Sequence, residues 1–323
     1  MAIRTIHVGL GTIGQAILRA TVSSGIATPV AGVDPAHAGE SLAAFTGGPS
    51  EAVVQPDLAA ALGHPADVAI VSTASAVPDL MATLRPLIAS GCNVVSTCEK
   101  LCYPWLETPE LATEIDDLAH RHGVTVVGTG INPGFLLDAL PVFLRRPVVS
   151  VRAVRATRTV NTARRRRQLQ EKTGAGLAPE EFARKAAEGS IGHVGLAESA
   201  ALVCRGLGWP VPETIDVRLE PVIADQPVMS EIGTVEAGMV RGQVQTVQLA
   251  GPEGQSLSLR LLMALGETDE ADEILIDGDP PVHARLIGGV FGDTATAGCT
   301  ANIIPQVVAA RPGLLTVLDL PLC

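Results

Sequence analysis

Short apolar runs alternate with amphipathic segments through the first 146 residues. Runs that are apolar on both faces are typical of strands buried in a parallel sheet, and the segments between them have helical spacing. The pattern predicts strands at 4–8, 29–33, 52–54, 68–73, 93–96 and 124–127, and helices that end near 24 or span 57–62, 78–90 and 108–121. This alternation indicates an α/β domain at residues 1–146, with a doubly wound parallel sheet of the Rossmann type.

The pattern changes after residue 146. Polar and apolar residues alternate from 149 to 160, which predicts a long antiparallel strand with one wet face. Under strict alternation Arg152 and Arg158 share a face and Arg155 lies opposite.

Further strands are expected through most of residues 214–287, after helices at 179–188 and 193–207. We therefore expect a second α+β domain at residues 147–291, built on a largely antiparallel sheet. Residues 293–310 return to a helical pattern and 314–319 read as a last strand, so we expect 292–323 to fold back onto the first domain.

The composition is that of an acidic globular protein. Hydrophobic residues make up 47% and charged residues 18%, which excludes disorder, and the net charge of -11 argues against a nucleic-acid partner. The one basic run, residues 164–167, is interpreted as solvated. No apolar run approaches the roughly 20 residues that span a membrane, and the chain starts with a strand instead of a signal peptide, so we expect a cytoplasmic protein.

The cysteines give no indication of a metal site. None of the six lies in a CxxC or Cys/His ligand spacing. Cys98 and Cys102 flank a candidate site described below, and we interpret them as buried, inert thiols.

A glycine-rich turn follows the first strand and opens a helix. The turn contains Gly9, Gly11, Thr12, Ile13 and Gly14 in the spacing of a dinucleotide fingerprint. The first glycine permits the tight turn, the second lets the backbone approach a pyrophosphate, and the third allows the helix to pack on the strand. The helix N-terminus that follows favours phosphates, because its N–H groups are free and its dipole is positive there.

The second strand ends in an acid, Asp34, at the spacing expected for a residue that accepts both hydroxyls of the adenosine ribose. Its charge would repel a 2′-phosphate and no arginine follows to compensate, so we expect NAD, with NADP possible. Thr73, Ala74 and Ser75 end the fourth strand and are expected to lie along this cofactor.

The chemistry is expected at the end of the fifth strand, where Glu99 and Lys100 follow the apolar residues 93–96. Ligands of open α/β sheets bind at the carboxyl ends of the strands. A charged pair there indicates a site, although a solvated strand-to-helix loop would have the same pattern.

The sixth strand runs into a loop with three glycines and a proline, residues 128–135. Such a loop allows close backbone approach and a defined turn. Asn132 and Phe135 could therefore face the same cleft as Glu99, and ordinary turn chemistry with a core phenylalanine explains them equally well.

Taken together, these stretches resemble the 2,4-diaminopentanoate dehydrogenases and the native amine dehydrogenases, distant kin of dihydrodipicolinate reductase. The resemblance covers almost the whole chain, and STCEKLCYP and GTGINPGF are its most specific stretches. The matching stretches are GLGTIG, STCEKLCYP, GTGINPGF, RTVNTARRRRQLQEKTGAG, GHVGLAES, GDTATA and NIIPQVVAARPGLLTVLDLP.

The resemblance implies a homodimer formed through the second domain and the NAD(P)-dependent interconversion of an amine with a ketone and ammonia. It assigns the family's essential carboxylate to Glu99. Cofactor contacts are also expected at Cys98 and Asn302. The family's substrate-pocket positions fall on Asn132, Phe135, Arg158, Asn161 and His193.

Lys100 supports a different enzyme. With Lys100 toward the nicotinamide, the chain would resemble the glucose–fructose oxidoreductase family, in which Glu-Lys-Pro at this strand end supplies a lysine for alcohol and sugar oxidation. Here Leu101 replaces the proline, and the family's glycine-rich histidine motif is not evident. Adjacent residues of an extended chain point to opposite sides, so we expect only one of the pair to face the cofactor.

Two further alternatives remain open at this stage. A non-catalytic NAD sensor would bind the cofactor without turning over any amine or carbonyl compound. His193, at the start of a predicted helix, either caps that helix or contacts substrate.

Overall fold

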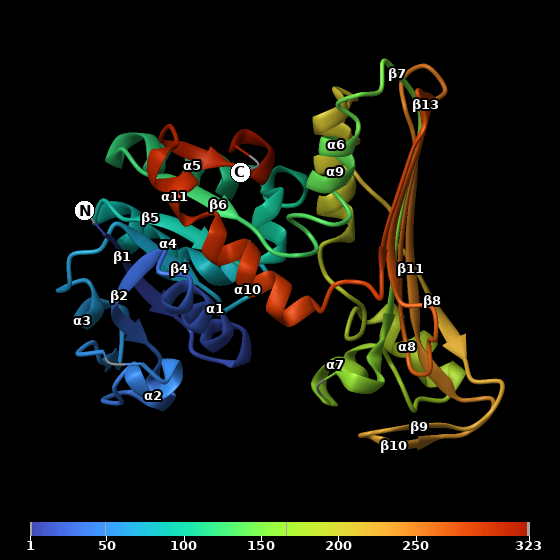
Figure 1. Cartoon of the computed structure of the whole chain (residues 1–323), viewed down its shortest axis with the longest axis horizontal. Coiled ribbons are helices and arrows are strands. Elements are labelled where there is room, and N and C mark those ends of the chain that lie inside the picture. The colour runs from blue at the N-terminus through green and yellow to red at the C-terminus, as the bar shows by residue number, and fades with distance from the viewer. Residues whose placement is uncertain (1, 49, 166, 322–323) are drawn as a thin grey trace. The chain divides into compact units, whose positions relative to one another are not determined.

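The computed structural model describes residues 2–48, 50–165 and 167–321, and the chain divides into two compact units (Figure 1). The first unit contains Met1–Phe135 and Phe291–Cys323, and the second contains Leu136–Val290. The second unit thus includes residues 136–146, which the sequence-based division at 146 assigns to the first domain.

The first unit is built on a seven-stranded parallel sheet in the order β15-β6-β5-β4-β1-β2-β3. The predicted Rossmann-type sheet is therefore confirmed. Its strands are β1 (Ile3–Val8), β2 (Ala27–Val33), β3 (Val54–Gln55), β4 (Val68–Val71), β5 (Asn93–Ser96), β6 (Thr125–Gly128) and β15 (Gly313–Leu315).

Helices pack against this sheet because their apolar residues recur at helical spacing. Leu80, Leu84 and Ile88 of one helix and Ile115 of the next join Val94 of the sheet in one buried cluster. The helices are α1 (Thr12–Ser23), α2 (Ala43–Thr46), α3 (Leu58–Ala61), α4 (Val77–Ala89), α5 (Pro109–His122), α10 (Gly292–Asn302) and α11 (Ile304–Ala309), with 3₁₀ turns η1 (Pro35–His37), η2 (Glu99–Cys102), η3 (Pro104–Leu106) and η5 (Val317–Asp319).

The C-terminal segment is more broken than its sequence pattern suggests. The single helix expected at 293–310 is divided at Ile303, because Pro305 follows within the first turn of α11 and cannot donate a helical hydrogen bond. The strand expected at 314–319 is limited to β15, and η5 follows it.

The second unit contains a six-stranded sheet in the order β14-β13-β7-β12-β11-β8 and a separate two-stranded ribbon. The predicted second domain, α+β with a largely antiparallel sheet, is confirmed. Its strands are β7 (Ser150–Asn161), β8 (Arg218–Ile223), β9 (Val228–Ser230), β10 (Gly233–Val235), β11 (Val240–Ala250), β12 (Ser256–Ala264), β13 (Ala271–Asp279) and β14 (Val282–Ile287).

One pairing in this sheet was predicted wrongly. The long strand β7 is antiparallel only to β13 and runs parallel to β12 on its other side. The alternation of polar and apolar residues sets the two faces of a strand but not the direction of its neighbours, so the pattern of 149–160 could not distinguish the two arrangements.

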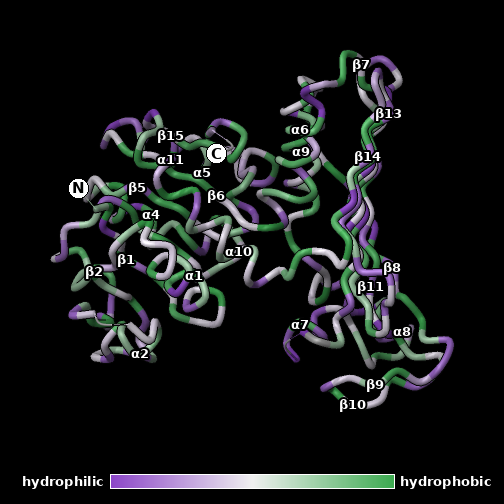
Figure 2. Tube along the Cα trace, viewed as in Figure 1, coloured by the Kyte–Doolittle hydropathy of each residue, from purple (hydrophilic) through white to green (hydrophobic). Residues whose placement is uncertain are grey.

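Helices α6 and α9 cover one face of this sheet (Figure 1). Alternate residues of the central strands point toward them, such as Ala156 and Leu259, and green and white-to-purple segments alternate along these strands (Figure 2). The helical elements of the unit are α6 (Ala139–Leu144), η4 (Thr162–Arg164), α7 (Arg167–Lys172), α8 (Pro179–Ala187) and α9 (Leu196–Leu207).

A buried histidine in β1 makes the stability of the protein depend on pH. His7 is 1% exposed, and its Nε2 lies 3.1 Å from the hydroxyl of Thr5, while its Nδ1 has no hydrogen-bond partner among the described residues. Burial lowers the pKa of His7 to about 3. The unfolded chain, with a pKa of about 6.5 at this side chain, therefore binds more protons than the native protein between these values.

We expect the contribution of His7 to the free energy of unfolding to be complete above about pH 6.5. As the pH falls below this value, the contribution should decrease by about 1.4 kcal/mol per pH unit. In urea denaturation from pH 7 to 5, His7→Val should lose less stability than the wild type. The exposed His64→Val variant is the control. Equal pH dependence in His7→Val and wild type would contradict this account.

Candidate functional site

The strand order of the first unit brings the sequence motifs together. From β1, the sheet continues through β2 and β3 on one side and through β4, β5 and β6 on the other side. The carboxyl ends of β1 and β4 therefore form the switch point at which open α/β sheets bind ligands. The glycine turn follows β1, Thr73 to Ser75 follow β4, and Glu99 follows β5.

The glycine turn has the geometry that a dinucleotide requires. A Cβ at Gly14 would overlap the carbonyl oxygen of Gly9, so the start of α1 packs directly on the turn. A Cβ at Gly11 would meet nothing within 4 Å, which leaves its backbone open to a ligand. Gly11 is also the N-cap of α1 and makes no side-chain cap, and Thr12 and Ile13 begin the helix. An uncapped helix N-terminus beside open backbone is suited to a pyrophosphate.

Asp34 connects the glycine turn to the end of β2. Its Oδ2 accepts a hydrogen bond from the Leu10 N–H at 2.8 Å, and its Oδ1 accepts one from the Ala36 N–H at 3.0 Å. Each carboxylate oxygen has a further lone pair, so both can still accept a ribose hydroxyl.

The segment after β4 also contacts the glycine turn. The Ser72 hydroxyl donates to the Gly9 carbonyl at 2.9 Å, and a Cβ at Gly9 would lie only 2.8 Å from the Thr73 methyl group. Ala74 packs on the core of the unit, and the Ser75 carbonyl accepts a hydrogen bond from the Lys100 N–H at 3.2 Å. These contacts bring three strand ends together in one place.

The two other expected cofactor residues differ in exposure. Cys98 is fully buried and its N–H donates to the Ser96 hydroxyl at 3.1 Å. Asn302 is an exposed residue at the end of α10, which packs against α1.

Glu99 begins the 3₁₀ turn η2 and is half-buried. The extended chain assumed for Glu99 and Lys100 is therefore wrong, and strand alternation does not separate their side chains. The Lys100 ammonium instead forms an ion pair with Glu107, which lies beyond η3.

The loop after β6 supports this turn from the other side. A Cβ at Gly128 would lie 2.5 Å from the backbone nitrogen of Cys102, so only glycine allows β6 to approach η2 this closely. The Thr129 N–H donates to the Ser96 carbonyl at 2.8 Å. Asn132 and Phe135, both half-buried, follow on this loop.

In the second unit, Arg158 lies buried on the core-facing side of β7. Its Nη1 is 3.5 Å from Oδ1 of Asp272, directly across on β13, and its Nη2 donates to the Val290 carbonyl at 2.7 Å. Burial raises the pKa of Asp272, and the positive charge of Arg158 opposes that rise. The two side chains thus form a buried charge pair in a low-dielectric setting.

His193 lies in an irregular segment before α9. The N-cap of α9 is Gly195, so the capping role considered for His193 is wrong. Its Nδ1 is buried without a hydrogen-bond partner among the described residues. Burial lowers the pKa of His193 to about 4, with the charges of Arg158 and Lys172 adding to the effect, so the imidazole is neutral at physiological pH.

The side chain of Asn161, at the end of β7, makes several local hydrogen bonds. Its amide donates to the Glu267 carbonyl at 2.9 Å, and its Oδ1 accepts from the N–H groups of Ala163 and Gly266. The basic run that follows is not solvated throughout, because Arg165 is 7% exposed. Arg166 and the Arg164 side chain lie outside the described part of the structure.

Sequence reasoning missed three buried polar residues on this sheet face, Gln243, Gln245 and Asp272. A signal was present, because the two glutamines occupy alternate positions of β11, on the same face as Val247. Recognising it requires knowledge of which face is covered by helix α9.

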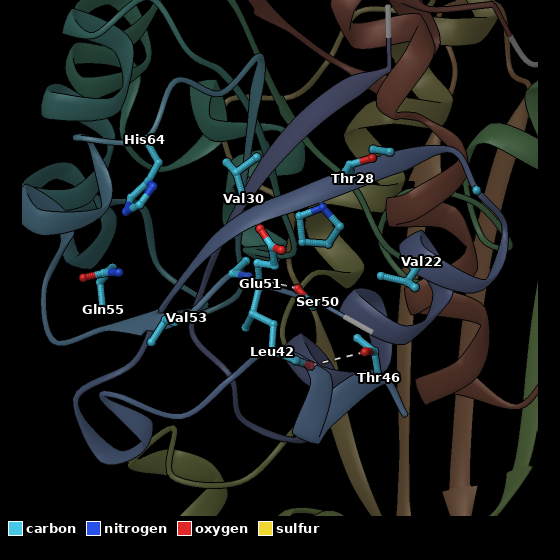
Figure 3. A pocket seen from close by; sticks show the side chains of 14 residues that line it. Val22, Thr28, Val30, Leu42, Thr46, Ser50, Glu51, Val53, Gln55 and His64 are labelled. Carbon is cyan, nitrogen blue, oxygen red and sulfur yellow. Dashed lines mark hydrogen bonds between the residues drawn. The ribbon is translucent and has the colours of Figure 1, made fainter. Parts of the chain in front are cut away.

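A hollow of about 660 Å³ lies away from these residues, along the outer edge of β2 (Figure 3). Side chains of Val22, Val30 and Leu42 line it together with Gln55 and His64. None of the expected site residues contributes to its lining.

Within the described residues, no group of three or more His, Cys, Asp or Glu side chains is arranged to hold a metal ion. In the same part of the chain, no helix combines the length and apolarity needed to cross a membrane.

The contact between β6 and η2 gives a direct test by substitution. We expect Gly128→Ala to lower the free energy of unfolding by at least about 1–3 kcal/mol, because the added Cβ displaces backbone atoms of η2. Gly298→Ala, inside α10 with open space at its Cβ, should instead raise it by about 0.5–1 kcal/mol. Denaturant unfolding measures both, and equal effects of the two substitutions would refute the close approach.

Comparison with known proteins places the chain in a family. The family model of the 2,4-diaminopentanoate dehydrogenase C-terminal domain matches residues 135–323. A 2,4-diaminopentanoate dehydrogenase from Acetoanaerobium sticklandii is 32% identical over 265 residues, which cover 79% of this chain and 74% of that protein.

Solved structures share the fold. An amine dehydrogenase from Mycobacterium smegmatis superposes with a TM-score of 0.85 at 24% identity and covers 99% of this chain and 96% of its own. GenD2 from gentamicin A biosynthesis, solved in complex with NAD, superposes with a TM-score of 0.57 at 17% identity over 98% of this chain and 90% of its own.

The family match extends over the whole second unit, and the curated relative covers most of the chain. The resemblance that the sequence motifs suggested is thereby confirmed. The chain belongs to the 2,4-diaminopentanoate dehydrogenase family of oxidoreductases.

Proposed function

We propose that this protein is an NAD(P)-dependent amine dehydrogenase that converts a small amine or diamino acid to the ketone and ammonia, and catalyses reductive amination in reverse. The observation that carries the proposal is the position of Glu99, in a turn held between the ends of β4 and β6 beside the switch point of the sheet. Membership of the 2,4-diaminopentanoate dehydrogenase family supports the same chemistry.

The glycine turn fits a nicotinamide dinucleotide, since Gly11 is open to a ligand and the α1 N-terminus is uncapped. When bound, the cofactor accepts a hydride in the oxidative direction and donates one in the other. Asp34 supports NAD over NADP, because its carboxylate would repel a 2′-phosphate.

Glu99 has to accept a proton from the substrate ammonium group. An alkylammonium has a pKa near that of lysine, about 10.4, and it cannot release a hydride until it has lost a proton and regained a lone pair. We assign this proton to the Glu99 carboxylate, which acts as the general base. Loss of hydride from the neutral amine leaves an iminium cation, and a nearby carboxylate stabilises that cation by its charge.

In the aminating direction the same carboxylate has a different use. Hydride addition removes positive charge, so an adjacent anion cannot accelerate that step electrostatically. Glu99 is needed earlier, when ammonia adds to the ketone and water leaves, because these steps require proton transfers and produce the iminium.

We further propose that Asn132, Phe135, Arg158, Asn161 and His193 contact the substrate. Arg158 is already paired with Asp272 at 3.5 Å, so a substrate carboxylate would have to share its charge with that acid. The neutral imidazole of His193 has a buried nitrogen available for a polar substrate group.

We propose a homodimer formed through the second unit. The sheet face opposite α9 carries Val244, Leu262 and Leu275 among polar and charged residues such as Thr157 and Arg155, a mixture suited to a contact with another copy. A monomer in sedimentation velocity at micromolar concentration would contradict this.

A cytoplasmic location is also proposed. Cys92, Cys98, Cys102, Cys204 and Cys299 are free thiols, as is typical of proteins from reducing compartments. Recovery in a periplasmic or secreted fraction would contradict it.

The first functional prediction concerns ammonia. NADH oxidation with a panel of small ketones should require ammonium, because the reducible species is the iminium and not the ketone. The assay follows NADH absorbance with and without ammonium at constant ionic strength. Ketone reduction at the same rate without ammonium would favour the alcohol or sugar oxidoreductase alternative that uses Lys100.

A second prediction separates Glu99 from Lys100. Glu99→Gln should lower kcat by at least about 100-fold, the usual contribution of a general base, while NADH binding is retained. Lys100→Ala removes an ion pair to the partly exposed Glu107 and should leave kcat within a few-fold of the wild type. Single-turnover kinetics and NADH fluorescence titration measure both, and the opposite pattern would reverse the roles.

The third prediction concerns the cofactor. The Michaelis constant for NADH should be lower than that for NADPH, because Asp34 repels the additional phosphate. Asp34→Asn removes the charge and keeps one of the two acceptor oxygens, so it should reduce this discrimination by at least about tenfold. A wild-type enzyme with the lower constant for NADPH would disprove the preference.

A further inference from the structure

The side-chain amide of Gln245 forms a two-point contact with the backbone of His193. Its Oε1 accepts from the His193 N–H at 2.8 Å, and its Nε2 donates to the His193 carbonyl at 3.0 Å. In a sheet, the N–H and the carbonyl of one residue are normally paired in this way by a residue of a neighbouring strand. Here one glutamine takes the place of a strand for a single residue of an irregular segment.

Gln243 completes the arrangement. It lies two residues earlier on β11, on the same face, and its Nε2 donates to Oε1 of Gln245 at 3.3 Å. Gln243 and Gln245 are 1% and 5% exposed, among leucines and valines. Buried amides cost stability unless they are hydrogen-bonded, so two of them on a core face indicate a specific task.

The segment that carries His193 needs an external restraint. Gly192 and Gly195 on either side have φ of +116° and +109°, and no regular helix or strand includes the four residues 191–194. Glycines with positive φ leave many backbone conformations open to this segment. The contact with Gln245 and the hydrogen bond from the Gly192 N–H to the Lys172 carbonyl at 3.2 Å together select one of them.

The restraint fixes the backbone that carries the imidazole relative to the charged residues of the same sheet face. Gln245, Leu261, Arg158 and Asp272 are paired across four adjacent strands, so they form one row. His193 is held at the Gln245 end of this row and experiences the charge of Arg158.

We propose that Gln245, oriented by Gln243, is a positioning residue that holds His193 in the geometry needed for substrate binding. This inference rests on the proposed contact between His193 and the substrate. Its physical basis, the contact between Gln245 and the His193 backbone, does not depend on that function.

The decisive variant is Gln245→Met, which keeps the length of the side chain and removes both hydrogen bonds. Gln248→Met, on the exposed side of the same strand, is the matched control. We expect the Michaelis constant for the amine to rise about tenfold or more in Gln245→Met, with that for NAD and the turnover number little changed. In a His193→Ala background the same substitution should add less than about twofold, because Gln245 acts through His193.

Histidine NMR gives a readout that does not involve activity. In the wild type the His193 signal, identified by its loss in His193→Ala, should titrate with a pKa of about 4. In Gln245→Met it should move toward the ordinary value of about 6.5 as the segment becomes mobile and solvated. If Gln245→Met does not fold, Gln243→Met, which removes only the orienting bond, should shift both readouts in the same direction by less.

An unchanged His193 titration together with an unchanged Michaelis constant in a folded Gln245→Met enzyme would overturn the proposal. A lowered unfolding temperature with both readouts unchanged would show a purely structural role and would also overturn it. If the wild type turns over no amine, the proposed function fails, and the NMR titration still decides whether Gln245 positions His193.

Discussion

The direct backbone contact between the end of β6 and the turn η2 holds the backbone segment that carries Glu99, the residue on which the proposed chemistry depends. Gly128 allows this approach, and hydrogen bonds from Thr129 to β5 and from Lys100 to the segment after β4 hold the turn from both sides. Glu99 is therefore positioned by the register of three parallel strands. Groups held on a rigid sheet keep their geometry better than groups on free loops, as proton transfer requires.

The second unit uses a different principle, in which polar groups replace part of an apolar core. Arg158, Asp272, Gln243 and Gln245 lie on the face that elsewhere carries leucine and valine. Each has at least one hydrogen-bond or ion-pair partner, which offsets part of the cost of its burial. The result is a polar region whose members have few alternative positions, at the end of an otherwise apolar layer.

Much of the fold could be predicted because its signals are local. Apolar runs and helical spacing located most elements of the first unit, and the glycine turn followed by Asp34 identified the nucleotide-binding end of the sheet. These features depend on residues close together in the chain. The parallel pairing of β7 with β12 depends instead on chain topology, and the alternating pattern of a strand carries no information about it.

The same limit applies to the site. The place of Glu99 after an apolar strand made it the candidate base. Its relation to Lys100 could not be predicted, because the two residues lie in a 3₁₀ turn that meets Gly128 in a long-range contact, where extended chain was assumed. The backbone conformation at His193 likewise depends on Gln245, 52 positions away in the sequence. Sequence motifs indicate the candidate site residues, and only tertiary contacts show how those residues are held.

The C-terminal segment has a consequence for how the protein forms. Strand β15 pairs with β6, and the Thr125 hydroxyl bonds to the Arg311 carbonyl across a separation of 186 residues. The nucleotide-binding sheet is thus discontinuous in the chain, and the whole second unit is inserted between its parts. On the ribosome the inserted unit emerges complete while its host still lacks an edge strand, since synthesis is vectorial and domains fold as units. The host sheet can be completed only after nearly the entire polypeptide has been made.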